Sequence, residues 1–179
     1  SASFPPGGVG NCYAEMWHSA DGGRTWQVRS QLTRLADNRG DEVGLLETAP
    51  SHVLCLLRSR RGKGLAQFRS SDNGRTWTEG EDLGVSLGCT LQRPFLTRLD
   101  KSRVLLSGRD LDRKMVVAYL SEDNARTWGH RTVIEKYKAD GAYTACVPLK
   151  DGSVLMTWYT DAHTAPRQPE IKTVKLWIR

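Results

Sequence analysis

The chain has 179 residues, which is long enough for one sizeable core or for part of a larger repeat array. Its hydrophobic content of 39% is ordinary for a soluble protein. No apolar run approaches the roughly 18 residues of a membrane span, so we expect a soluble chain and leave its compartment, secretion included, open. The net charge of +6 favours an anionic partner such as phosphate or an acidic sugar. Nucleic acid is disfavoured because the chain has neither a lysine-rich tract nor an RNA-binding motif with interleaved aromatic residues.

Cysteine and histidine usage gives no sign of a metal or a cofactor. Cys12, Cys55, Cys89 and Cys146 are widely spaced, and no two of them form a C-x-x-C pair. Free buried thiols are the favoured interpretation, and a disulfide between distant strands is the alternative. The four histidines include no pair at i, i+4. We therefore predict no metal site and no cofactor.

One eight-residue motif recurs three times along the chain. It reads SADGGRTW at residues 19–26, SSDNGRTW at 70–77 and SEDNARTW at 121–128, and successive copies begin 51 residues apart. A constant period of this size indicates a repeat architecture in which each period forms one supersecondary unit. The Asp and Gly predict a tight hairpin turn, in which the Asp side chain accepts backbone N–H groups.

Short β-type runs surround these turns. In chain order we expect strands at residues 13–18, 27–32, 42–47, 52–57, 65–69, 78–83, 95–99, 103–107, 115–120, 131–135, 145–149, 154–159 and 173–178. No useful segment has a helical period, so the prediction is an all-β chain. A full period holds four strands, as in one blade of a β-propeller. The predicted divisions are an N-terminal extension at 1–10 and blades over 11–179, namely a half blade at 11–35, blades at 36–86 and 87–138, and an incomplete final blade at 139–179.

The hairpin order sorts the loops between two faces of the predicted propeller. The three motif turns lie on one face, and the opposite face carries residues 36–42, 58–64, 84–94, 108–114, 136–143 and 160–168. These segments are rich in Arg and Lys, and the guanidinium fork suits a carboxylate. We therefore expect any site for an anionic ligand on this second face.

The motif matches the Asp box, S-x-D-x-G-x-T-W, and the chain resembles the sialidase superfamily of β-propellers over residues 11–178. The resemblance implies a six-bladed ring in which this chain corresponds to the C-terminal half, about three blades. The third box has Ala125 in place of Gly, so we expect strain or reshaping in that turn. The family places these boxes at the periphery, which implies a structural role for Asp21, Trp26, Asp72, Trp77, Asp123 and Trp128.

The same resemblance assigns candidate site residues. Glu42 in GDEV opens a blade, Arg58 in LLRS ends its second strand, Arg113 in LDRK precedes a third strand, and Tyr143 in GAYT precedes the final blade's first strand. In sialidases these positions imply a retaining glycoside hydrolase with Tyr143 as nucleophile and Glu42 as its base. Arg58 and Arg113 would bind the carboxylate of a sialic-acid-type sugar.

Two of these assignments have competitors. Arg109 is the alternative to Arg113 because it lies 51 residues after Arg58, at the repeat-equivalent position. Glu47 competes with Glu42 but falls at the Asp-box end of its strand, which counts against it.

Two parts of the family's site have no match in this sequence, namely the first arginine of the carboxylate-binding triad and the aspartate acid/base. Asp41 is a candidate substitute acid. A single chain is therefore expected to be a poor enzyme, and we expect a second copy or another chain to complete the ring. The alternative functions are a non-catalytic glycan- or protein-binding propeller and a purely structural repeat array.

Overall fold

The computed structural model describes residues 14–32, 42–58, 64–165 and 168–178. This part of the chain is all-β apart from one short helix, which agrees with the predicted fold class. Its elements are β1 (Ala14–His18), β2 (Gln27–Leu32), β3 (Val43–Ala49), β4 (His52–Arg58), β5 (Leu65–Ser70), β6 (Glu81–Asp82), α1 (Leu83–Leu87), β7 (Leu91–Arg98), β8 (Val104–Asp110), β9 (Met115–Ser121), β10 (Gly129–Lys136), β11 (Gly141–Pro148), β12 (Ser153–Thr160) and β13 (Glu170–Trp177).

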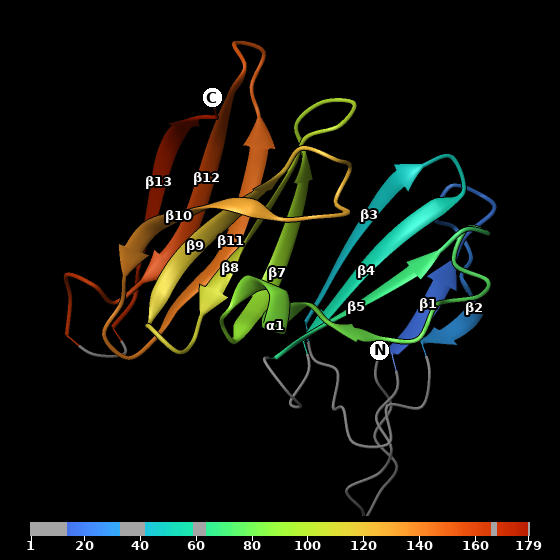
Figure 1. The fold of residues 1–179 in the computed structure, drawn as a ribbon, viewed down its shortest axis with the longest axis horizontal. Helices are drawn as coiled ribbons and strands as arrows, with labels where there is room; N and C mark the ends of the chain where they lie inside the picture. The colour runs from blue at the N-terminus through green and yellow to red at the C-terminus, as the bar shows by residue number, and fades with distance from the viewer. Residues whose placement is uncertain (1–13, 33–41, 59–63, 166–167, 179) are drawn as a thin grey trace, which may run out of the picture.

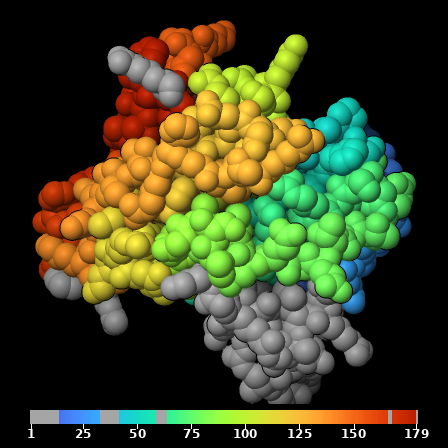
Figure 2. Space-filling view, in the orientation of Figure 1, coloured from blue at the N-terminus to red at the C-terminus, as the bar shows by residue number. Residues whose placement is uncertain are grey.

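The strands form four antiparallel sheets, each built from strands that are consecutive in sequence. Their orders are β1-β2, β3-β4-β5-β6, β7-β8-β9-β10 and β11-β12-β13. Figure 1 shows the sheets side by side in chain order, from β1 and β2 on the right to β13 on the left. The same succession is visible on the surface in Figure 2, where teal, green, gold and red segments follow one another across the face.

Hydrophobic side chains fill the space between each pair of neighbouring sheets. Leu32 and Phe68 belong to the core between the first and second sheets, and Leu54 belongs to the core between the second and third. Val116 and Trp158 lie in the core between the third and fourth sheets. Central strands are therefore buried on both faces, which explains their nearly continuous apolar sequences.

The three Asp boxes form the same hydrogen-bonded turn. In the second box, Asp72 Oδ1 accepts the backbone N–H groups of Arg75 at 3.0 Å and Thr76 at 2.9 Å, and Oδ2 accepts the Thr76 hydroxyl at 2.7 Å. Asp21 and Asp123 make the corresponding bonds in the other two boxes. Both oxygens of each box carboxylate are thus used within the turn.

The third box keeps the shape of the other two although it has Ala125 in place of Gly. Ala125 has a φ of 63°, in the left-handed region that Gly74 occupies at 76°, and its N–H bonds to Ser121 Oγ at 2.8 Å, as Gly74 N–H bonds to Ser70 Oγ. The turn is strained at a residue with a Cβ, but it is not reshaped.

Two predicted strands begin earlier than expected because each contains a β-bulge. β7 starts at Leu91 and has a register shift between Gln92 and Phe95. β11 starts at Gly141 and has a register shift between Ala142 and Ala145. Sequence periodicity breaks at a bulge, so residues 84–94 and 136–143 resembled loops.

The strand expected at residues 78–83 is reduced to the two residues of β6. It is followed by α1, a helix that the sequence did not predict, which ends at Gly88 with a φ of 65°. Leu83 and Leu87 of this helix pack against the core between the second and third sheets. Their burial explains why an apolar segment with weak helical signal forms this single turn.

Within the described ranges, no helix is long and apolar enough to cross a membrane. The described residues also contain no group of three or more His, Cys, Asp and Glu side chains able to hold a metal ion. Cys55, Cys89 and Cys146 are free thiols, while Cys12 lies outside the described residues.

Candidate functional site

Glu42 and Tyr143 are in direct contact although 101 residues separate them in sequence. Glu42 immediately precedes β3, and Tyr143 lies in the bulge of β11. In Figure 1 both of these strands begin at the lower ends of their sheets. The Tyr143 hydroxyl donates to Glu42 Oε1 at 2.9 Å. This contact joins the second sheet to the fourth, across the strands of the third.

Arg58 at the end of β4 holds the Glu42 carboxylate. Its Nη1 donates to Oε1 at 2.8 Å and to Oε2 at 2.9 Å. The backbone reinforces the pair, since Arg58 N–H bonds to the Glu42 carbonyl at 2.8 Å. The hairpin register of β3 and β4 therefore brings these two side chains together.

Arg93, for which we predicted no role from the sequence, lies over the Tyr143 ring. Its guanidinium carbon is 3.8 Å from the ring centroid, a cation–π distance. Its Nε lies 3.7 Å from Glu42 Oε1, and its Nη1 donates to the Tyr159 hydroxyl and to the Gly141 carbonyl, the latter at 3.3 Å. A φ of 58° in the β7 bulge aims this side chain at the site.

Arg109 at the end of β8 forms the other side of the cluster. Its Nη1 donates to Asp140 Oδ1 at 2.6 Å, and its Nη2 donates to Gln92 Oε1 at 3.0 Å. Arg93 Nη1 approaches the same Asp140 oxygen at 3.6 Å. Asp140 therefore bridges two guanidinium groups just before the strand that carries Tyr143.

Asp161 fixes the backbone on which Asp140 is placed. The side chain of Asp161 is fully buried, and its two oxygens accept the N–H groups of Lys138 at 2.7 Å, Ala139 at 2.9 Å and Asp140 at 3.1 Å. Three bonds to one carboxylate make this turn well defined.

The electrostatics keep the Tyr143 phenol protonated in this arrangement. Burial raises the pKa of Tyr143 above its ordinary value of 10, and the hydrogen bond to Glu42 raises that pKa further, whereas the charge of Arg93 acts in the opposite direction. At neutral pH the hydroxyl is thus a neutral donor paired with an acceptor carboxylate. Such a pair can move the phenol proton to Glu42 as a new bond to oxygen forms.

The cluster excludes Arg113 and Glu47. Arg113 is half exposed and pairs with the buried Asp110 at 3.0 Å; Arg109, its alternative, is the arginine that the structure brings to the cluster. Glu47 is exposed near the opposite end of β3, where it pairs in register with Val53. Asp41 lies outside the described residues.

Arg93 and Asp140 are the residues that sequence reasoning missed. Arg93 was counted only among the basic residues of its face, and Asp140 was not singled out. A proline after Arg93, inside an apolar β-type run, is a signal for a bulge that could have identified the first. No sequence signal identifies Asp140, because its partners come from other sheets.

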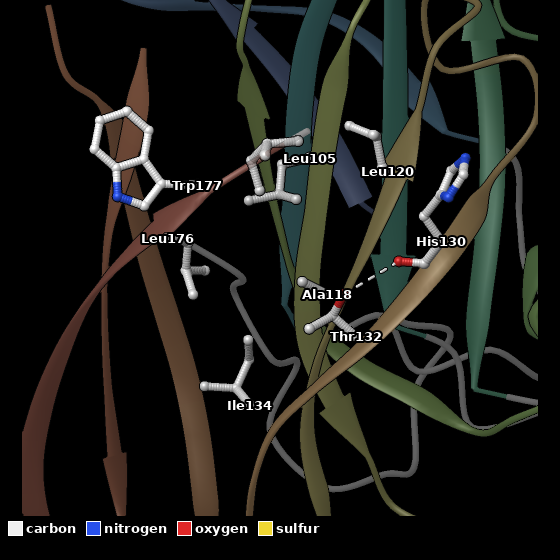
Figure 3. Close-up of a pocket in the computed structure, with 9 residues that line it drawn as sticks. Leu105, Ala118, Leu120, His130, Thr132, Ile134, Leu176 and Trp177 are labelled. Carbon is white, nitrogen blue, oxygen red and sulfur yellow. Dashed lines mark hydrogen bonds between the residues drawn. The ribbon is translucent and has the colours of Figure 1, made fainter. Parts of the chain in front are cut away.

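A separate apolar pocket opens between the third and fourth sheets, as Figure 3 shows. Its volume is about 190 Å³, and it is lined by Leu105, Ala118, Leu120, His130, Thr132, Ile134, Leu176, Trp177 and Ile178. The Thr132 hydroxyl donates to the His130 carbonyl at 3.4 Å within it. Leu105 lies at the start of β8, whereas Arg109 lies near its end, so this pocket is at the opposite end of the strand from the candidate site.

The four successive antiparallel sheets and the three Asp-box turns define a β-repeat protein. The model of the BNR repeat-like domain matches residues 9–156, and the chain belongs to this family. No relative among curated proteins matches the sequence.

Solved structures with the same fold include several sialidases. Hadza microbial sialidase Hz136 is 20% identical with a TM-score of 0.63, over 92% of this chain and 32% of its own. NanB sialidase from Streptococcus pneumoniae is 18% identical with a TM-score of 0.63, over 93% of this chain and 27% of its own. The leech intramolecular trans-sialidase is 19% identical with a TM-score of 0.59, and the match covers 91% of this chain and 26% of the leech protein. The chain thus spans about a third or less of the length of these structures.

Proposed function

We propose that the chain carries the nucleophile part of a sialidase-type active site and acts on sugars of the sialic acid class. The contact between the Tyr143 hydroxyl and Glu42 Oε1, at 2.9 Å, is the observation that carries this proposal. A phenol bonded to a carboxylate and surrounded by guanidinium groups matches the residue types expected from the sequence resemblance. Membership of the BNR-repeat family supports the same reading.

In the proposed reaction, Tyr143 Oη attacks the anomeric carbon and forms a covalent glycosyl–tyrosine bond. The phenol proton passes to Glu42, and the bond from the anomeric carbon to the leaving oxygen breaks, so that this oxygen departs as an anion and takes a proton from solvent. Water then attacks the same carbon and breaks its bond to Tyr143 Oη. Glu42 returns its proton to Tyr143, the extra proton of the attacking water passes to solvent, and the net result is retention. A neutral phenol suits this carbon because the sugar's own carboxylate would repel an anionic nucleophile.

Arg58 and Arg109 are proposed to bind the sugar carboxylate, with Arg109 in place of Arg113. In sialic acid the carboxylate is attached directly to the anomeric carbon, so binding it beside Tyr143 brings the reacting carbon within reach. Arg58 has a second role, because its bonds to both Glu42 oxygens orient that base toward Tyr143.

Release of a fluorescent alcohol from an aryl α-sialoside tests the proposal. We expect Tyr143→Phe to abolish release and Glu42→Gln to reduce it by about 10²–10⁴-fold. Tyr137→Phe is the matched control, because it removes a nearby buried hydroxyl that has no hydrogen-bond partner among the described residues. Full turnover by Tyr143→Phe would refute the nucleophile assignment.

Non-catalytic sugar binding is the second candidate function. Among the described residues, Arg58 and Arg93 lie near Glu42 and Arg109 pairs with Asp140. Guanidinium groups gathered in this way bind an anion whether or not a bond is cleaved. This second function would be favoured if wild type binds free N-acetylneuraminic acid without turnover and Arg58→Ala does not bind it. Absence of both binding and turnover would leave only a structural repeat array.

A further inference from the structure

The Asp140 carboxylate pairs with two arginines, Arg93 and Arg109, that face the candidate site. Its Oδ1 accepts a hydrogen bond from Arg109 Nη1 at 2.6 Å and lies 3.6 Å from Arg93 Nη1. The two guanidinium groups are the buried partners, at 10% and 12% exposure, whereas the Asp140 side chain is 43% exposed. An anion arriving from solvent therefore meets the Asp140 carboxylate before it reaches the arginines.

Both arginines have other bonds that hold them in place without Asp140. Arg109 also donates to Gln92 Oε1 at 3.0 Å. Arg93 stacks on the Tyr143 ring and donates to the Tyr159 hydroxyl and the Gly141 carbonyl. The pair is thus preorganised for a planar carboxylate, which guanidinium groups bind well.

The Asp140 side chain can rotate away from the two arginines while the backbone of this turn keeps its position. The N–H groups of residues 138–140 are held by Asp161, so the main chain of this turn does not depend on the Asp140 carboxylate. Apart from the arginines, the Asp140 side chain accepts the N–H of Gly141 at 3.0 Å and a hydrogen bond from the Tyr159 hydroxyl. Rotation of a partly exposed side chain is a small and fast motion.

We propose that Arg93 joins Arg109 in binding the acidic group of the ligand, beside Arg58, and that Asp140 is the internal anion which this group displaces from Arg93 and Arg109. The inference rests on the proposed function for the identity of the sugar, but not for the arginine pair itself. Asp140 then determines specificity, because only a ligand with its own anionic group can replace a carboxylate on two guanidinium groups. A neutral sugar that displaced Asp140 would leave the buried Arg109 guanidinium without this counter-ion, which is unfavourable.

Asp140→Asn tests this displacement, because it removes the charge and keeps an oxygen at the position that accepts Gly141 N–H. Calorimetric titration with N-acetylneuraminic acid should give about a tenfold tighter Kd than wild type, as expected for loss of a competing, partly exposed ion pair. The methyl ester of the same sugar should show no gain. In an Arg93→Gln background the gain from Asp140→Asn should shrink, because one of the two guanidinium groups is gone.

Asp151→Asn is the matched control. Asp151 is 45% exposed and also pairs with a cation, Lys175, at 2.5 Å, but it lies between β11 and β12 at the other end of the sheet. This control lowers the negative charge by the same amount, and its affinity should equal that of wild type. Thermal unfolding of each variant verifies that the fold is kept.

An equal or weaker affinity of folded Asp140→Asn for N-acetylneuraminic acid would overturn the inference and make Asp140 a scaffold for Arg109. Acetate, followed by NMR titration, separates the inference from the proposed function. A gain for acetate with no sugar binding in either protein would support the arginine pair and refute the sugar. If neither probe binds either protein, the arginine pair is not an anion site.

Discussion

Arg93 and Tyr143 point into the site for the same reason. Each has a positive φ and lies in a β-bulge of the first strand of its sheet, β7 or β11. Their φ values are 58° and 67°. Space for the first bulge comes from glycines on both sides. A Cβ at Gly108 would lie 2.8 Å from the Gln92 carbonyl oxygen, and one at Gly44 would lie 3.0 Å from that of Pro94. Bulges of this kind re-aim side chains near functional sites at the cost of local strain.

Gly108→Ala should therefore destabilise the protein through the β7 bulge. The new methyl group would press on the backbone of Gln92, which cannot move as a side chain would, and we expect a loss of about 1–3 kcal/mol in the free energy of unfolding. Urea denaturation followed by tryptophan fluorescence measures it. Gly129→Ala is the control, because a Cβ there meets nothing within 4 Å. Equal midpoints for the two variants would show that the bulge is not constrained in this way.

Single residues of the site differ in how far sequence could predict them. Glu42, Arg58 and Tyr143 fall within short motifs, so resemblance selected them, and the structure places them in contact. The choice between Arg113 and Arg109 depended on where a strand ends. β8 ends at Asp110, three residues later than expected, which puts Arg109 at the cluster, while Arg113 lies in the following turn. Asp140 depends on packing between sheets, which local sequence does not encode.

The Asp box is the element that sequence predicted best, because all of its bonds are local. Carboxylate, hydroxyl and backbone partners lie within four residues of one another in each copy. By contrast, the strand expected at 78–83 contains only the two residues of β6, since Leu83 and Leu87 are drawn into the core as part of α1. Local bonding fixes the turns, whereas tertiary burial decides this segment.

The Asp boxes should make stability fall in acid. Hydrogen bonds from Thr25 hold the pKa of Asp21 at about 2. For Asp123, burial raises the pKa, but the hydrogen bonds from Thr127 and Ser121 outweigh it and hold the pKa at about 2. The unfolded value is about 3.9, so folding favours the ionised form. This stability is complete above about pH 4 and is lost as pH falls towards about 2.

Thermal unfolding midpoints between pH 5 and pH 2.5 check this expectation. Asp72, whose pKa is also lowered by its bonds to Thr76, is the residue to change. We expect Asp72→Asn to have a lower unfolding midpoint than wild type near neutral pH. We also expect its midpoint to decrease less than that of wild type as the pH falls. Glu79→Gln, at an exposed carboxylate just after the same turn, should leave both unchanged. A steeper fall for Asp72→Asn than for wild type would contradict the assignment.

At the scale of the molecule, apolar side chains remain exposed at both ends of the row of sheets. On the last sheet, Val147, Leu155, Ile171 and Trp177 are exposed, and the first two pair directly across β11 and β12. Their strand neighbours Val174 and Leu176 instead pack into the core with the third sheet. At the other end of the row, Trp17 and Val28 pair across β1 and β2 and are also exposed. Apolar side chains exposed together on one face of a sheet are typical of an interface.

We therefore propose that a second copy of the chain covers the outer face of the last sheet, and we expect a light-scattering mass of at least two chains. Ile171 is 82% exposed, so Ile171→Lys should weaken association by placing an ammonium group in the apolar interface without disturbing the core of either copy. Val85→Lys is the control, because Val85 is 67% exposed on α1, away from that face. A single-chain mass at high protein concentration would refute association, and equal dissociation of both variants would move the interface elsewhere.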